Sequence, residues 1–153
     1  MTRAYHTLGR PFGATALVLA ILIGWSRPSM AGETVEIKML NKGADRYMVF
    51  EPEVVRIKPG DTIKFVAADK GHNAVTIKEL LPSGAEPFRG KINEELAITL
   101  STPGVYGFRC DPHYTLGMVG VVIVGEPTNL EAAKQAKLPG KAGEVMTKLL
   151  GSL

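Results

Sequence analysis

Four side chains of this sequence could together hold one metal ion. Cys110 is the only cysteine, and His113 follows it three residues later and Met118 eight residues later. One short loop can therefore supply a thiolate, an imidazole and a thioether. A second histidine, His72, lies upstream in the polar segment 70–73. Thiolate and thioether are soft ligands, and two imidazoles with one thiolate and a weak axial methionine suit a copper ion that exchanges single electrons.

Three of these residues also have a simpler interpretation when each is taken alone. Cys110 could be a buried, inert thiol, His72 could be an exposed histidine, and Met118 could pack in the core beside the apolar segment after it. However, a free exposed thiol in an oxidising compartment would be open to cross-linking and oxidation. The position of His113 and Met118 close behind the cysteine favours the metal. The joint pattern, rather than any one residue, predicts a copper site.

The start of the chain has the pattern of a cleaved signal peptide. Two arginines make a positive leader, and residues 14–24 form a short apolar run that is followed by a small-x-small pattern ending at Ala31. The alternative is a membrane anchor, but the run falls short of the roughly 20 residues that span a bilayer. We therefore expect residues 1–31 to be removed, leaving a mature chain of residues 32–153.

Removal of the leader changes the charge balance. The whole chain of 153 residues has 18 basic and 15 acidic side chains, a formal net charge of +3. Arg3, Arg10 and Arg27 lie in the leader, so 15 basic residues remain against 15 acidic ones. A neutral total gives no support for nucleic-acid binding, which needs a basic surplus. Only the local arrangement of charge can matter for a partner.

Residues 32–125 have the pattern of an all-β sandwich. Short segments that alternate apolar and polar residues are separated by turn signals such as residues 58–61, Lys-Pro-Gly-Asp. The expected strands cover residues 35–39, 54–57, 62–67, 96–100, 104–109 and 119–124, and the expected loops cover residues 69–72 and 82–90. About 120 residues make one domain with one core. The two strands that flank the cysteine loop would hold it at its base.

The chain changes character after Gly125, and residues 128–150 predict a helical extension. Residues 128–131, Thr-Asn-Leu-Glu, match a capping box and are followed by good helix formers. Pro139 ends this helix. A second helix is expected over residues 141–150, with Val145, Met146 and Leu149 facing inward. The helices could contact a partner, but covering an open face or end of the sandwich is the simpler role.

The mature chain resembles the cupredoxins, or small blue copper proteins, and within them it is similar to the pseudoazurins. The resemblance covers residues 39–44, 48–52, 69–73, 91–94 and 112–114 and the two C-terminal helices, in that order. It implies one cupredoxin domain over residues 32–153, a Greek-key β-sandwich with two C-terminal α-helices. It also implies one type 1 copper ion held by His72, Cys110, His113 and Met118.

Ligand chemistry gives each of these four residues a role. Cys110 must be a thiolate, and the metal lowers its pKa to make it one. The imidazoles of His72 and His113 must be neutral, each with one nitrogen for copper and the other for an orienting partner. Met118 would be the long axial ligand that tunes the reduction potential.

The residues around the ligands have less specific assignments. The resemblance implies that Asn41 and Asn73 tie the ligand loops together and donate a hydrogen bond near the sulfur, and that Met48 packs beside the exposed imidazole. Ordinary turn or core roles stay open for all three. Pro112 offers no N–H to the sulfur, and Asp111 adds a negative charge that would favour the oxidised state.

The resemblance implies a periplasmic carrier of single electrons, without catalytic residues, rather than an enzyme. Electrons would pass through the edge of His113, in an apolar surface patch with Pro112, Leu116 and Met48 as candidate members. Such a patch within a basic rim suits weak, steered encounters with an acidic partner. The basic residues expected around it are Lys42, Lys70, Lys78, Arg89, Lys91 and Arg109, any of which alone could be an ordinary solvated residue. The family's partners are copper nitrite reductase and c-type cytochromes. No nucleic acid, membrane anchor or oligomer is expected.

Other functions remain as alternatives. A copper oxidase or reductase needs further histidine ligands, whereas the mature chain has only His72 and His113. A copper-delivery protein would favour several exchangeable Met or Cys donors. A binuclear copper module needs a second cysteine, and a purely structural sandwich would leave the single exported thiol unexplained.

Overall fold

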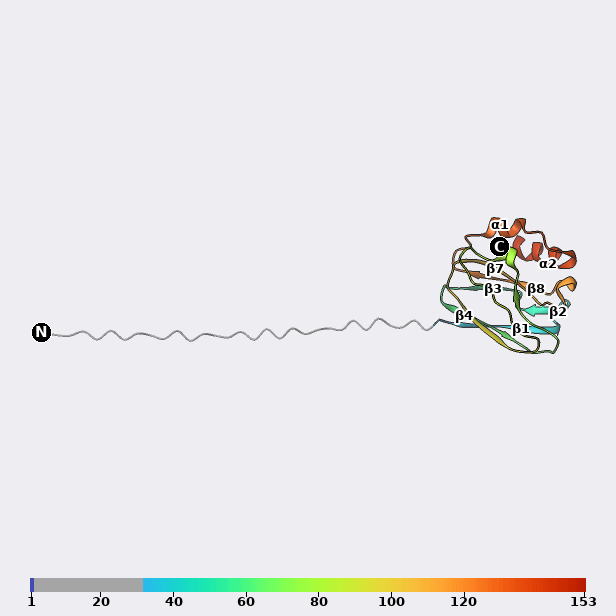
Figure 1. Cartoon of the computed structure of the whole chain (residues 1–153), viewed down its shortest axis with the longest axis horizontal. Helices are drawn as coiled ribbons and strands as arrows, with labels where there is room; N and C mark the ends of the chain where they lie inside the picture. Colours follow the sequence, from blue (N-terminus) through green and yellow to red (C-terminus); the bar gives the residue numbers. More distant parts are fainter. Residues whose placement is uncertain (2–31) are drawn as a thin grey trace.

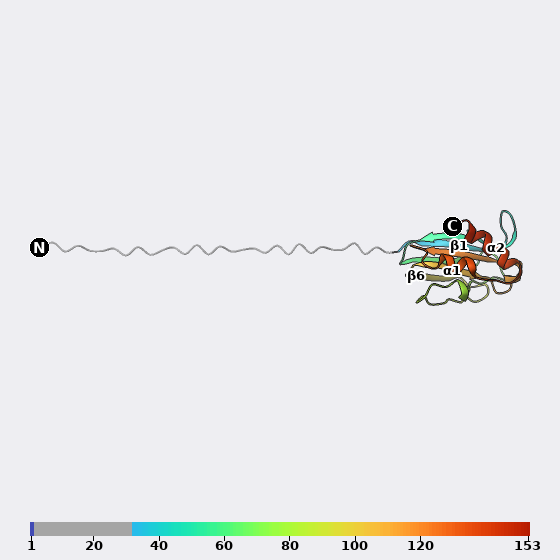
Figure 2. The ribbon, with the colours of Figure 1, turned by 90° about the horizontal axis from the view of Figure 1, so that it is seen from above.

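Two four-stranded sheets face each other in the computed structural model, which describes Met1 and residues 32–153. Two C-terminal helices lie side by side against the sandwich in both views (Figure 1, Figure 2). This architecture confirms the predicted all-β sandwich with a helical C-terminus. Apart from Met1, the signal peptide predicted for residues 1–31, with cleavage after Ala31, lies outside the described residues.

The two sheets are mixed, each with one parallel pair of strands. In order across the first sheet lie β2 (Tyr47–Glu51), β1 (Thr34–Lys42), β4 (Asp61–Val66) and β6 (Leu96–Leu100). In order across the second lie β3 (Val54–Ile57), β8 (Val119–Val124), β7 (Gly104–Arg109) and β5 (Val75–Thr76). The pairs β1–β4 and β3–β8 are parallel, and the other pairs are antiparallel. The six predicted strands are all present. Four of them, β3, β6, β7 and β8, have the predicted bounds, and β1 and β4 have shifted ends. The prediction missed β5, which is too short for a periodic pattern, and β2.

The strand β8 is buried along its whole length because both of its faces are covered. Val122 and Val124 belong to the core between the sheets, whereas Val121 and Ile123 pack in a second cluster with the helices. Gly120 leaves room for an aromatic ring, since a Cβ there would lie 2.4 Å from Cζ of Phe108. The sandwich therefore has two apolar cores, one on each side of β8.

The helix α1 (Leu130–Gln135) does not begin with the predicted capping box. The side chain of Asn129 instead accepts a hydrogen bond from the Val105 amide at 2.6 Å and donates one to the Val105 carbonyl at 3.0 Å. Thr128 donates its hydroxyl to the carbonyl oxygen of Pro103 at 3.2 Å. The capping-box prediction was wrong because β7 and the turn before it offer these side chains partners that local sequence cannot show.

The helix α2 (Gly140–Gly151) packs against β8 through a face that shares only Met146 with the predicted one. Ala142, Met146 and Leu150 are fully buried, at the i, i+4 and i+8 positions of one helical stripe. Val145 and Leu149, which were predicted to face inward with Met146, are only partly buried. The helices cover the outer face of the second sheet, as expected. Neither of the α-helices in the described part of the chain is long and apolar enough to cross a membrane.

Candidate metal centre

The cysteine loop joins β7 to β8, which are antiparallel neighbours with Arg109 opposite Val119. The amide of Cys110 donates to the carbonyl oxygen of Met118 at 3.0 Å, and the amide of Met118 donates to that of His113 at 3.2 Å. These bonds close the loop on itself. The prediction that two neighbouring strands hold the loop at its base is confirmed.

Three of the four predicted ligand side chains meet at one point. His72, from the loop after β4, places Nδ1 at 3.7 Å from Sγ of Cys110, and Nδ1 of His113 lies 3.5 Å from the same sulfur. The two Nδ1 atoms are 3.1 Å apart. Metal bonds of about 2.0 Å to nitrogen and 2.3 Å to sulfur, the values known for zinc, fit donors at these separations. The donor set is soft and fits copper.

The orientation of His72 is set by its second ring nitrogen. Its Nε2 lies 2.9 Å from Oδ1 of Asn41, and because a carbonyl oxygen only accepts, Nε2 carries the proton. Nδ1 is then left with a free lone pair that faces Cys110 and His113. Burial, and secondarily the neighbouring His113, lower the pKa of the fully buried His72. Both effects keep the imidazole neutral, as a metal ligand requires.

The Cys110 thiol is fully buried. Burial raises its pKa, although hydrogen bonding from the backbone of Asn73 and His113 acts in the opposite sense. The protein alone therefore favours the protonated thiol. A bound metal ion would displace this proton, since the thiolate is the form that binds metals.

Met118 is fully buried in the core cluster that also contains Cys110. The residue before it, Gly117, has a φ of +86°, a conformation that favours glycine. A Cβ at Gly117 would lie only 3.0 Å from Cγ2 of Val145 in α2. Met118 therefore lies at the end of the loop, where its backbone is hydrogen-bonded to Cys110 and His113. Its service as an axial ligand stays a prediction.

Two asparagines tie the loops around the site together. Asn73 accepts the amide of Asp111 at 2.9 Å and donates to the carbonyl of Gly90 at 3.1 Å, as the predicted linking role requires. Asn93 accepts the amide of Gly71 at 2.5 Å and donates its own amide to the carbonyl of His72 at 2.9 Å. Sequence reasoning gave Asn93 no role. Its φ of +66° is one that asparagine tolerates better than most residues, but sequence does not reveal that conformation.

The negative charge of Asp111 is compensated by two arginines. Arg89 forms an ion pair with one carboxylate oxygen, and Nε of Arg109 donates to the other at 3.0 Å. Burial alone would raise the pKa of Asp111, but these two guanidinium groups outweigh it and lower the pKa. The negative charge that the sequence places beside Cys110 is therefore paired with two basic side chains, and its effect on the oxidised state stays a prediction.

The surface beside His113 combines apolar and basic residues. Leu116 is 50% exposed, Pro112 is exposed and His113 is partly buried. Met48 is partly buried against the inner core, and its packing beside the imidazole stays a prediction. Of the six basic residues expected around this surface, Lys42, Lys70, Lys78, Arg89 and Lys91 are exposed and Arg109 is partly buried. Tyr47 is also exposed and lies under Nζ of Lys42, 5.8 Å from the ring centroid.

Known proteins resemble this chain over most of its length. The family of copper-binding proteins named plastocyanin/azurin matches residues 37–125. A pseudoazurin of Paracoccus pantotrophus is 52% identical over 132 residues, which cover 86% of this chain and 90% of that protein. The solved structure of a Sinorhizobium pseudoazurin is 53% identical with a TM-score of 0.76, covering 78% of this chain and 95% of that one. That of the Methylobacterium extorquens AM1 pseudoazurin is 44% identical with a TM-score of 0.75, covering 78% and 98%.

Proposed function

The chain belongs to the plastocyanin/azurin family of copper-binding proteins, and we propose that it is a periplasmic carrier of single electrons. One type 1 copper ion would be held by His72, Cys110, His113 and Met118. The observation that carries the proposal is the meeting of two Nδ1 atoms and one Sγ within 4.8 Å of one another. Copper in this donor set can alternate between Cu(I) and Cu(II) and so accept and release one electron.

The surrounding residues would hold the ligand side chains in place while the copper ion changes its oxidation state. Asn41 orients His72, Asn73 fixes the loop at Asp111, and the bonds between Cys110 and Met118 close its base. Ligands held in this way need little rearrangement for either oxidation state. Burial of the cysteine and of His72 excludes water from that side of the site. These properties suit fast electron transfer.

Electrons would leave through His113, the ligand that is only partly buried. The exposed Pro112 and Leu116 beside it would form the centre of a small docking face, and the basic residues would form its rim. Apolar contacts with a charged rim suit a weak, rapidly formed complex with an acidic redox protein. Copper nitrite reductase and c-type cytochromes are the partners that we propose. The carrier would act as a monomer.

We further propose that the protein is not an enzyme and that its mature domain spans residues 32–153. His72 and His113 are the only histidines of this segment, and both would be used by the one copper ion. A second, substrate-binding copper would need further imidazoles. Residues 1–31 would be the leader that directs export.

Reconstitution with copper tests the proposal. The purified mature protein should turn deep blue with Cu(II) through thiolate-to-copper charge transfer, and Cys110→Ser should abolish the colour. Far-ultraviolet circular dichroism of both proteins would show that the fold is retained. A folded wild-type protein that stays colourless would refute the carrier function.

A second experiment tests export and partner choice. Cell fractionation and N-terminal sequencing of the full chain should find a periplasmic product that begins at Gly32. The rate of electron transfer to an acidic partner should fall as salt is raised, since salt screens exposed charges. A salt-independent rate would contradict electrostatic steering without contradicting copper binding.

A further inference from the structure

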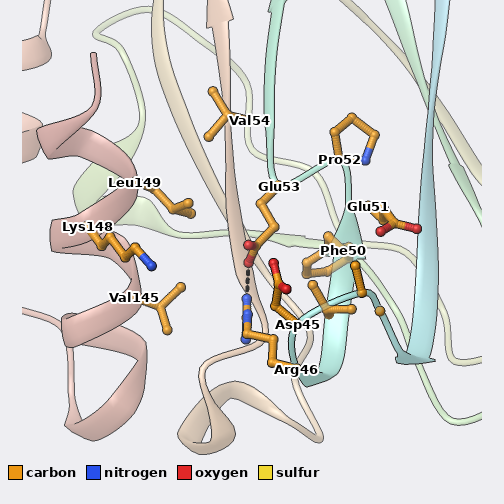
Figure 3. A pocket seen from close by; sticks show the side chains of 13 residues that line it. Asp45, Arg46, Phe50, Glu51, Pro52, Glu53, Val54, Val145, Lys148 and Leu149 are labelled. Carbon is orange, nitrogen blue, oxygen red and sulfur yellow. Dashed lines mark hydrogen bonds and ion pairs between the residues drawn. The ribbon is translucent and has the colours of Figure 1, made fainter.

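Arg46 connects the end of the cysteine loop to the turn between β2 and β3. Its Nη1 donates to the carbonyl oxygen of Gly117 at 2.8 Å, although the two residues are 71 positions apart. Its Nη2 forms an ion pair with the carboxylate of Glu53 (Figure 3). The two side chains are only 21% and 27% exposed, and burial lowers the pKa of Arg46. The contact is therefore better protected from solvent than an ordinary surface ion pair.

The carbonyl that Arg46 holds belongs to the peptide that leads into Met118. The same oxygen accepts the amide of Val119 at 3.0 Å. On another side of Gly117 lies α2, where Cγ2 of Val145 and Cγ of Lys141 would contact a Cβ at 3.0 and 3.2 Å. The peptide is thus fixed by a charged hydrogen bond at its oxygen and by a helix at its Cα.

Beside this contact the protein is not closely packed. A cavity of about 460 Å³ lies between α2 and the segment from Gly43 to Val54, and the ion pair of Arg46 and Glu53 lines it (Figure 3). On this side the turn is tied to Gly117 by the charged hydrogen bond of Arg46.

We propose that Arg46, anchored by Glu53, is a positioning residue that fixes the distance between Sδ of Met118 and copper and thereby tunes the reduction potential. The inference rests on the proposed function, because it concerns the same copper ion. A long axial bond to a thioether is weak, so the protein scaffold sets its length more than the bond itself does. Holding the peptide before Met118 is a direct way to set it.

The first test is the double variant Arg46→Met, Glu53→Gln, which leaves the net charge unchanged. Loss of a hydrogen bond to a charged group should speed amide exchange at Met118 by about tenfold or more in the copper-free protein. In the copper-loaded protein the ratio of the visible charge-transfer bands should change. The matched control, Lys64→Met with Glu95→Gln, removes an ion pair at β4, in the sheet that does not carry the cysteine loop, and should change neither property. If the double variant fails to fold, Arg46→Lys, which keeps the charge beside Glu53, takes its place.

The second test asks whether Arg46 acts through Met118. The double variant should raise the reduction potential, because a weaker axial donor stabilises Cu(II) less. In the Met118→Leu background the same double variant should produce no further shift. An equal shift in both backgrounds would overturn the inference, as would unchanged exchange and unchanged spectra. A wild-type protein that fails to turn blue would instead refute the proposed function itself.

Discussion

Oδ1 of Asn41 lies 2.9 Å from Nε2 of His72, although Asn41 is near the end of β1 and His72 is in the loop after β4. The amide oxygen fixes the proton on Nε2 and leaves Nδ1 free to face the sulfur of Cys110. The exposed end of one strand therefore decides the tautomer of a fully buried candidate ligand.

Replacement of Asn41 by Ala should weaken copper binding. The imidazole of His72 would lose the partner that orients it, and loss of such a partner typically costs about 10- to 100-fold in metal affinity. Competition with a chelator of known affinity measures the change. Asn129→Ala removes an equally well bonded asparagine on the α1 side and should leave the affinity unchanged. An affinity within threefold of the wild type in Asn41→Ala would contradict the orienting role.

Met118→Leu should retain copper and the blue colour but raise the reduction potential. Leucine has a similar volume and offers no donor, so Cu(II) loses a weak ligand. We expect a rise of about 60 mV or more, which corresponds to a tenfold change in relative affinity for the two oxidation states. Redox titration measures it, and Met146→Leu in α2 is the control. An unchanged potential would mean that Met118 is not axial.

Asp111→Asn should raise the potential as well, for an electrostatic reason. A negative charge beside Cys110 favours Cu(II), and its removal leaves Arg89 and Arg109 without their shared partner. A partly solvated charge contributes at most about 1 kcal/mol, or roughly 40 mV for one electron. Redox titration measures this shift.

Electron transfer to an acidic partner should also become faster at low salt and more sensitive to salt. The control is Glu126→Gln, beyond the far end of β8, which should change neither the reduction potential nor the rate of electron transfer. A lowered potential in Asp111→Asn would be inconsistent with this account.

Tyr106→Phe should lower stability at neutral pH and flatten its decline in alkali. Burial raises the pKa of the Tyr106 hydroxyl, which donates to the carbonyl of Thr102 at 2.8 Å. A raised pKa means that the hydroxyl's contribution is full below the ordinary pKa of about 10 and is lost as pH rises through the folded value. Loss of the hydrogen bond should cost about 1 kcal/mol at pH 7. Urea unfolding at several pH values measures the free energy of unfolding of both proteins. If this free energy fell equally steeply in alkali for the wild type and for Tyr106→Phe, the predicted flattening would be contradicted.

Met146→Ala should destabilise the copper-free protein by about 2–5 kcal/mol, since the side chain is fully buried between α2 and β8. The midpoint of urea unfolding measures the loss. Thr147→Ala, on the exposed side of the same helical turn, should stay within about 0.5 kcal/mol of the wild type. Equal stabilities for the two variants would mean that α2 does not form a core with β8.

The copper loop was predictable from sequence because its chemistry is local. Cys110, His113 and Met118 fall within nine residues, and a single cysteine has few other uses in a chain that is predicted to be exported. The strands β1, β4 and β6 of the first sheet were predictable because period-two alternation follows from burial of one face. The run of β8, which is rich in valine and ends before Gly125, was also recognised.

The helical end shows where local signals fail. The Thr-Asn-Leu-Glu pattern predicted a capping box, but Asn129 binds β7 instead. The inward face of α2 was placed on Val145, Met146 and Leu149. Of these only Met146 is fully buried, and Ala142 and Leu150 complete the buried stripe that faces β8. Several apolar residues on one helix allow more than one inward face, and only the surface that the helix meets selects among them.

The sequence by itself determined the donor chemistry, since residue types and short spacings define which atoms can bind a soft metal. It also determined the β-sandwich, because the alternation of apolar and polar residues and the turn-forming residues are local properties of the sequence. Only the tertiary structure decided which distant residues act on the ligands and the loop. Asn41 orients His72, two arginines pair with Asp111, and Arg46 binds the carbonyl of the peptide before Met118. The physical reason is that hydrogen bonds and ion pairs act over a few ångströms in space, while these partners lie up to 71 residues apart along the chain.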